Sequence, residues 1–148
     1  MASKNVASKK AVKKKPETTE IPASAKYLLD KEWLSAQRDS LLEERDRYTL
    51  SAERLAAEAA ALMADREPGD VQFDEESGEG DTIAVERDRD LALSAAARQA
   101  VSEIDEALKR LDNNTYGICT ASGDPIPKAR LEAIPEASVC VEHKTSMF

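Results

Sequence analysis

The chain has 148 residues, a length that suits one domain with tails. Hydrophobic residues make up 41% of it, but aromatic residues only 4%, and 34% of the chain is charged. This mixture favours long, solvated helices and excludes a broad sheet core or a deep active-site cleft. The formal net charge of -8 conceals six lysines and no acid in residues 1–15, which leaves 15 basic and 29 acidic residues elsewhere. The excess of acidic residues outside this segment repels nucleic acid, which argues against specific DNA binding.

Residues 1–25 are rich in Lys, Ala and Ser, and we predict a disordered basic tail, because no apolar face could offset the entropy of ordering. Two roles stay open for it: a solubilising tail, or a segment that touches nucleic-acid phosphates. The N-terminus has no apolar run of the kind found in signal peptides or membrane spans. We therefore expect a cytoplasmic protein with no membrane partner.

Residues 30–64 are predicted to form a helix with an apolar stripe at seven-residue spacing. The stripe consists of Leu34, Leu41, Tyr48, Leu55 and Leu62, with Arg38, Arg45, Ala52 and Ala59 at the intermediate positions. A repeat of seven indicates a coiled coil, in which the small alanines permit close approach and the two arginines extend their charged ends to solvent. Trp33 and Tyr27 add apolar surface at the base of this helix.

A second helix is predicted over residues 83–111 and ends at the polar run 112–114. Its apolar positions alternate four and three apart: Ala97, Val101, Ile104, Leu108 and Leu111. Two such helices joined by one loop form an antiparallel hairpin, although a parallel dimer of each helix is the alternative. We favour the hairpin, and hence a monomer, because each helix then has a partner within its own chain.

The loop between the two helices, residues 66–82, contains Gly and Pro residues that break helices. It carries seven acids with no base between them: Glu67, Asp70, Asp74, Glu75, Glu76, Glu79 and Asp81. Their spacing does not match a standard calcium-binding loop. Two interpretations remain, a solvated turn or an acidic tip at the end of a rigid rod.

Residues 113–148 contain two knuckles, Cys119-x-x-Ser122 and Cys140-x-x-His143. Four thiolate or imidazole ligands at this spacing would close a structural zinc site. Serine at position 122 is a poor ligand, because its hydroxyl stays protonated near neutral pH. One alternative is therefore a Zn²⁺ site with the ligands Cys119, Cys140 and His143. The other is a metal-free module in which Ile118, Ile126, Leu131, Ile134 and Val139 pack against the helix bases. In the cytoplasm, reducing conditions argue against a resting Cys119–Cys140 disulfide.

The surrounding pattern resembles the C-terminal finger of the DksA/TraR family. The matching residues are Tyr116, Gly117, Cys119, Gly123, Ile126, Arg130, Leu131, Ala133, Pro135, Ala137 and Cys140. Residues 86–117 also resemble the family's second coiled-coil helix. The resemblance implies a mainly α fold: a coiled-coil hairpin over residues 26–112, then a zinc-finger-like module over residues 113–148.

The resemblance also implies a function, namely that of a bacterial transcription regulator that binds RNA polymerase. In the family the hairpin enters the secondary channel and its acidic tip modulates initiation, in some members together with the alarmone ppGpp. The tip positions here are Asp74, Glu75, Glu76, Glu79 and Asp81. Glu79 falls near the aspartate of the family's Asp-x-Ala element, and Asp81 replaces its alanine.

Two other functions remain open from the sequence. One is a coiled-coil adaptor that has lost polymerase binding and kept the scaffold. The other is a nucleic-acid binder that uses the lysine tail, although the finger is a poor phosphate surface. We do not expect an enzyme, since no phosphate loop and no nucleophile–base spacing is present.

Overall fold

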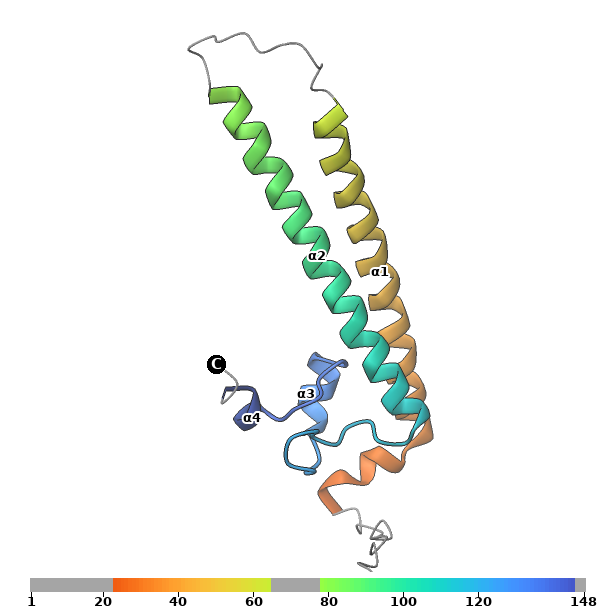
Figure 1. The fold of residues 1–148 in the computed structure, drawn as a ribbon. Helices are drawn as coiled ribbons and strands as arrows, with labels where there is room; N and C mark the ends of the chain where they lie inside the picture. Colours follow the sequence, from red (N-terminus) through yellow and green to blue (C-terminus); the bar gives the residue numbers. More distant parts are fainter. Residues whose placement is uncertain (1–22, 65–77, 146–148) are drawn as a thin grey trace, which may run out of the picture.

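The computed structural model describes residues 23–64 and 78–145, and nearly all of its regular structure is helical. The elements are η1 (Ala23–Leu29), α1 (Lys31–Ala64), α2 (Gly78–Asp112), α3 (Lys128–Ala133) and α4 (Val141–Thr145). α1 and α2 form a long antiparallel hairpin, and the segment that carries α3 and α4 lies beside its base (Figure 1). The predicted fold class is confirmed. Within the described ranges, no helix is both long and apolar enough to cross a membrane.

The predicted tail and tip loop fall mainly outside the described residues, at 1–22 and 65–77. Where they can be compared, two boundaries differ from the prediction. Residues 23–25, assigned to the tail, belong to η1, and Ala25 is fully buried. α2 begins at Gly78, five residues before the predicted start at 83. Glycine is tolerated there because first-turn N–H groups lack intrahelical partners, and the neighbouring acids suit the positive end of the helix.

Leucine and alanine seams hold the hairpin together. Leu41 on α1 and Ile104 on α2 are fully buried near the base, and small residues follow toward the tip. The buried seam residues are Leu41, Ala52, Leu55 and Ala59 on α1, and Ser94, Ala97, Ile104 and Ala107 on α2. Tyr48 was predicted in the seam but is 40% exposed. A straight helix drifts by about 20° per heptad from a strict repeat of seven, and closely packed alanines leave little room for a phenol ring.

Polar contacts across the hairpin fix its register. Arg38 pairs with Asp112 at 2.6 Å, and Arg45 pairs with Asp105 at 2.6 Å. Both arginine side chains stay about two-fifths exposed, as predicted, so each pair stabilises the fold only modestly. Nearer the tip, the buried Ser94 hydroxyl donates to the backbone carbonyl of Ala52 at 2.9 Å. As residue numbers rise along α1 their partners' numbers fall along α2, which is the antiparallel register.

The C-terminal module shares a core with the hairpin base. Ile126 and Leu131 are fully buried in the same cluster as Leu41 and Ile104. Two aromatic residues predicted at this base lie there, with the Tyr27 and Trp33 rings edge to face at 5.2 Å. The module is therefore continuous with the hairpin core.

Candidate metal centre and hairpin tip

Two short turns position the knuckle residues. In the first, Gly123 N–H donates to the Cys119 carbonyl at 2.8 Å, and Cys119 N–H donates to the Asp124 carbonyl at 2.8 Å. Gly123 has a φ of 79°, a conformation that favours glycine. In the second, Lys144 N–H donates to the Cys140 carbonyl at 3.0 Å. This helical bond opens α4 and places His143 one turn beyond Cys140.

The polypeptide passes very close to η1 just before the first knuckle. Gly117 has a φ of 81°, and a Cβ atom at this position would overlap with Leu28 Cδ2. Only glycine fits this position without movement of the neighbouring side chain. The close approach explains why glycine stands two residues before Cys119 in the motif.

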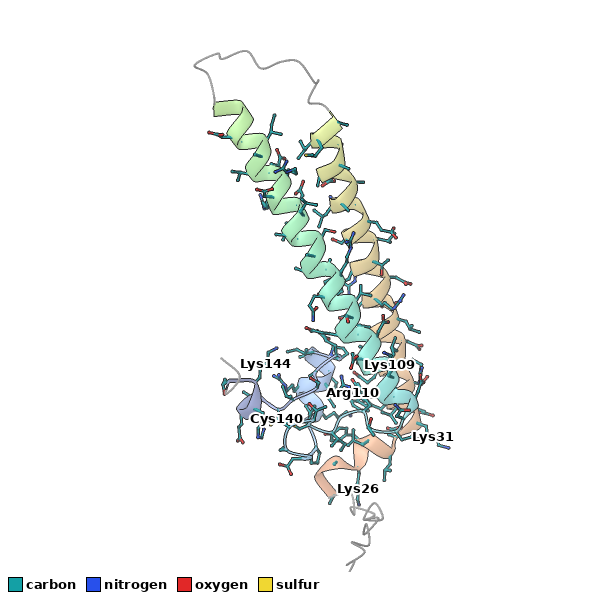
Figure 2. All side chains as sticks on the ribbon, in the orientation of Figure 1. Lys26, Lys31, Lys109, Arg110, Cys140 and Lys144 are labelled. Carbon is teal, nitrogen blue, oxygen red and sulfur yellow. The ribbon has the colours of Figure 1, made fainter. Side chains whose placement is uncertain are left out.

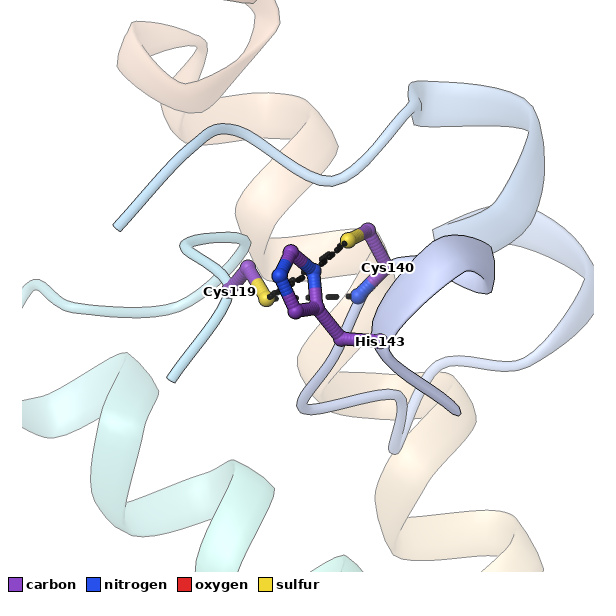
Figure 3. A group of neighbouring side chains, drawn as sticks. All are labelled: Cys119, Cys140 and His143. Carbon is purple, nitrogen blue, oxygen red and sulfur yellow. Dashed lines mark hydrogen bonds between the residues drawn. The ribbon is translucent and has the colours of Figure 1, made fainter. Parts of the chain in front are cut away.

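Three knuckle side chains converge, as Figure 3 shows. The Sγ atoms of Cys119 and Cys140 are 3.8 Å apart. Nδ1 of His143 lies 2.7 Å from Cys140 Sγ and 4.0 Å from Cys119 Sγ. Both cysteines are free thiols, with Cys119 buried and Cys140 half-buried. Among the described residues, this trio is the one group of three or more Cys, His, Asp or Glu side chains placed to hold a metal ion.

The trio fits zinc as a three-ligand set. Tetrahedral coordination with Zn–S of about 2.3 Å and Zn–N of about 2.0 Å requires S···S of about 3.8 Å and S···N of about 3.5 Å. The sulfur–sulfur distance meets this value, and the two sulfur–nitrogen distances fall on either side of it. A shift of the His143 ring by about 1 Å or less would centre the ion, so Cys119, Cys140 and His143 could hold zinc. Zinc would supply a crosslink between the two knuckles.

Ser122 lies next to Cys119 but plays a different part. Its hydroxyl oxygen accepts a hydrogen bond from Asp124 N–H at 3.2 Å, and the side chain is exposed. Burial raises the pKa of the Cys119 thiol, but hydrogen bonds from the Ser122 hydroxyl and from nearby backbone N–H groups outweigh burial and lower that pKa to about 6. Ser122 therefore favours the thiolate form of Cys119, the form that binds metal.

Hydrogen bonds attach the module to the helices without any metal. The Tyr116 hydroxyl contacts Gln37 Oε1 at 3.2 Å and donates to the Pro135 carbonyl at 2.7 Å. Burial raises the pKa of Tyr116, chiefly because the phenolate would lose hydration there. Arg110, at the end of α2, donates to the carbonyls of Glu136 and Ala137, both at 3.1 Å (Figure 2). These bonds fix the module on the hairpin base.

Apolar packing of the module follows the metal-free alternative closely. Ile126 and Leu131 form its core, and Ile134 and Val139 pack against them. Ile118 is half-buried and lines a groove beside Leu28. This core means that the module has a source of stability other than a metal ion.

Those predicted tip residues that the structure describes lie at the far end of α2 from this centre. Asp81 is exposed in the first turn of α2, and Glu79 belongs to the same turn. Asp74, Glu75 and Glu76 lie outside the described residues. The tip and the metal centre therefore occupy opposite ends of the molecule (Figure 1).

Comparison with known proteins relates the chain to the same family as its sequence motif does. The model of the prokaryotic DksA/TraR C4-type zinc finger matches residues 114–142. The RNA polymerase-binding transcription factor DksA of Caulobacter vibrioides is 45% identical over 64 residues, which is 42% of this chain and 45% of that protein. YteA of Bacillus subtilis is 40% identical over 73 residues, 49% of this chain and 30% of that protein. The chain thus spans less than half the length of these two relatives.

The likeness extends beyond the finger. An Aquifex aeolicus protein is 31% identical over 121 residues, 77% of this chain and 75% of that protein. The solved structure of transcription factor DksA2 from Pseudomonas aeruginosa superposes with a TM-score of 0.66 and 29% identity, covering 83% of this chain and 88% of that one. The chain belongs to the DksA/TraR family.

Sequence reasoning missed two residues that build the site's support. Arg110 stands one residue before a seam position, and nothing in the heptad pattern marks it as the link to the module. Gln37 is buried at 7% exposure, where it meets the Tyr116 hydroxyl. A polar residue one helical turn before the buried Leu41 was the available signal, but its partner is 79 residues away in the chain.

Proposed function

We propose that this protein is a non-enzymatic transcription regulator that binds RNA polymerase, with the α1–α2 hairpin inserted in the secondary channel. The observation that carries the proposal is the match to DksA2 over 88% of that chain, which includes the hairpin as well as the finger. The name of the DksA relative from Caulobacter vibrioides supports polymerase as the partner.

The dimensions of the hairpin suit a channel. α1 and α2 contain 34 and 35 residues, so at 1.5 Å per residue each is about 50 Å long. Two packed helices form a rod only about 20 Å across, since one helix with its side chains is about 10 Å wide. The cross-helix bonds at Arg38, Arg45 and Ser94 hold this rod in one register. A rod of this shape presents its tip at a distance from the bulky module.

The chemistry of the tip suits a basic or metal-bearing surface. Seven acids lie between residues 67 and 81 with no base among them. We propose that the acids at 74, 75, 76, 79 and 81 face the polymerase catalytic region and modulate initiation by charge complementarity. ppGpp is proposed as a partner at the complex, and the monomer as the active form in the cytoplasm.

In vitro transcription with tip variants tests this function. The double variant Glu79→Gln/Asp81→Asn removes two tip charges, and Glu43→Gln/Asp46→Asn removes two exposed charges from α1 as the matched control. We expect the tip variant to lose most of its effect on open-complex lifetime, with or without ppGpp, and the control to keep it. Equal regulation by tip variant and wild type would show that these charges do not act. Absence of any polymerase binding by the wild type would favour the adaptor function instead.

A further inference from the structure

The metal centre has three protein ligand atoms where a closed structural zinc site has four. Cys119, Cys140 and His143 supply two sulfurs and one nitrogen. The described residues place no further Cys, His, Asp or Glu ligand atom in this group. A zinc ion bound here would therefore need one more ligand from another source.

Ser122 is the adjacent residue, but its hydroxyl is already engaged. It accepts a hydrogen bond from Asp124 N–H at 3.2 Å. A neutral hydroxyl is also a poor zinc ligand. The Ser122 side chain is exposed to solvent, whereas Cys119 is buried and Cys140 and His143 are half-buried.

We propose that the centre binds Zn²⁺ through Cys119, Cys140 and His143 and leaves a fourth position, beside Ser122, that takes an exchangeable thiolate from solution. Two thiolates and a neutral imidazole bring the charge of the bound ion to zero, so one further monoanion is easily accommodated. A thiolate completes the three-sulfur, one-nitrogen set that zinc favours. A small-molecule thiol that occupied this position would release its proton to solvent, and no electrons would be transferred.

A metal ion at this centre would stabilise the module but would not be essential for its fold. Because Ile126 and Leu131 form a core and Arg110 and Tyr116 attach the module to the helices, the module has contacts that do not pass through the metal. Loss or exchange of the fourth ligand then changes the centre without unfolding the module. The proposal concerns the finger alone, so its outcome is separate from that of polymerase binding.

Cobalt spectroscopy of the full-length chain tests the proposal. Metal-free protein receives one equivalent of Co²⁺ without reductant, and 2-mercaptoethanol is then added while thiolate-to-cobalt absorbance is followed. We expect saturable growth of that absorbance by about 1.5-fold, because a third thiolate joins two. Failure to bind Co²⁺, or a spectrum that does not change with thiol, would overturn the proposal.

Two variants at position 122 sharpen the result. Ser122→Cys supplies a third protein thiolate and should show the higher absorbance without added thiol and no further response. Ser122→Ala should still bind Co²⁺ and still respond to thiol, because the hydroxyl is not a ligand. A Ser122→Ala protein that binds Co²⁺ but no longer responds to added thiol would contradict the proposal.

Discussion

The hairpin shaft and the C-terminal module bury their residues in different ways. Along the shaft, small and aliphatic side chains repeat at helical intervals, and Ala52, Leu55 and Ala59 occupy successive turns. In the module, two fully buried aliphatic side chains and a few side-chain-to-backbone hydrogen bonds carry the structure. The shaft repeats one kind of contact, whereas each contact in the module occurs once.

This difference has a consequence for mutations. Loss of one shaft contact leaves similar contacts in the turns above and below, so the damage is local. Loss of one module contact removes a larger share of what holds the module on the helices. Trp33 packs near Tyr116 and its indole donates to Glu132, so its fluorescence reports on this junction.

The largest effect is expected from Leu131→Ala. Leu131 is fully buried in the shared core, and truncation there leaves a cavity that should lower the free energy of unfolding by about 2–5 kcal/mol. Urea unfolding followed by Trp33 fluorescence measures it. The control is Leu50→Ala, at a shaft position that is 67% exposed, and it should stay within about 0.5 kcal/mol of wild type. Similar losses at both sites would remove the contrast between the regions.

Arg110→Met should follow in size. The variant keeps much of the apolar stem but loses the donors to the Glu136 and Ala137 carbonyls, at a cost of about 1.5–3 kcal/mol. Arg45→Met, which breaks the exposed pair with Asp105, should cost no more than about 1 kcal/mol. Urea unfolding compares the two, and a larger effect at Arg45 would contradict the anchoring role of Arg110.

Gly117→Ala should cost about 1–3 kcal/mol, because the residue has positive φ and its new Cβ would meet Leu28. Gly123→Ala shares the positive φ but has no atom within 4 Å of the added carbon, so it should be milder. Thermal unfolding by circular dichroism compares the pair. Equal losses would mean that backbone conformation alone, and not the approach to η1, requires the glycine.

Ser94→Ala tests the polar contact within the shaft seam. Removal of the Ser94 hydroxyl leaves the Ala52 carbonyl without this donor, and we expect the free energy of unfolding to fall by about 0.5–1.5 kcal/mol. Ser102→Ala, at an exposed position of the same helix, is the control. Urea unfolding followed by far-ultraviolet circular dichroism measures both. A neutral Ser94→Ala would show that alanine packing offsets the lost hydrogen bond.

The smallest effect is expected where the two regions meet through like charges. Burial, and then the nearby Glu136 carboxylate, raise the pKa of Glu44, while Arg47 opposes them. When the pKa of a carboxyl group is higher in the folded than in the unfolded state, the folded protein loses stability as the pH rises through the folded-state pKa. Glu44→Gln should therefore raise the free energy of unfolding at pH 7 by less than about 1 kcal/mol, and the gain should vanish in acid. Glu43→Gln, at an exposed neighbouring position, is the control variant.

The shaft was largely predictable because its signal is periodic and local. Apolar residues at seven-residue spacing identified both helices and the pairing of their seams, and the exposed ends of Arg38 and Arg45 were expected. Tyr48 was misplaced because a heptad count ignores how small its neighbours are. The start of α2 was missed because glycine was read as a helix breaker without regard to its position in the first turn.

The module was predictable in composition but not in attachment. The knuckle spacing predicted that Cys119, Cys140 and His143 lie together, and the structure places their ligand atoms within 4.8 Å of one another. The links through Arg110 and Gln37 join residues 26 and 79 positions apart. No local pattern encodes such pairs, since they depend on how the module sits on the hairpin.

Site-specific crosslinking to core RNA polymerase tests the central claim most directly. A photoreactive amino acid is placed at position 79 in the first turn of α2, and a matched one at the exposed Val141 of the module. The account predicts that position 79 crosslinks inside the secondary channel and that position 141 crosslinks only outside it. No crosslink from position 79 by a folded, helical protein, or crosslinks confined to the outer surface of polymerase, would contradict it.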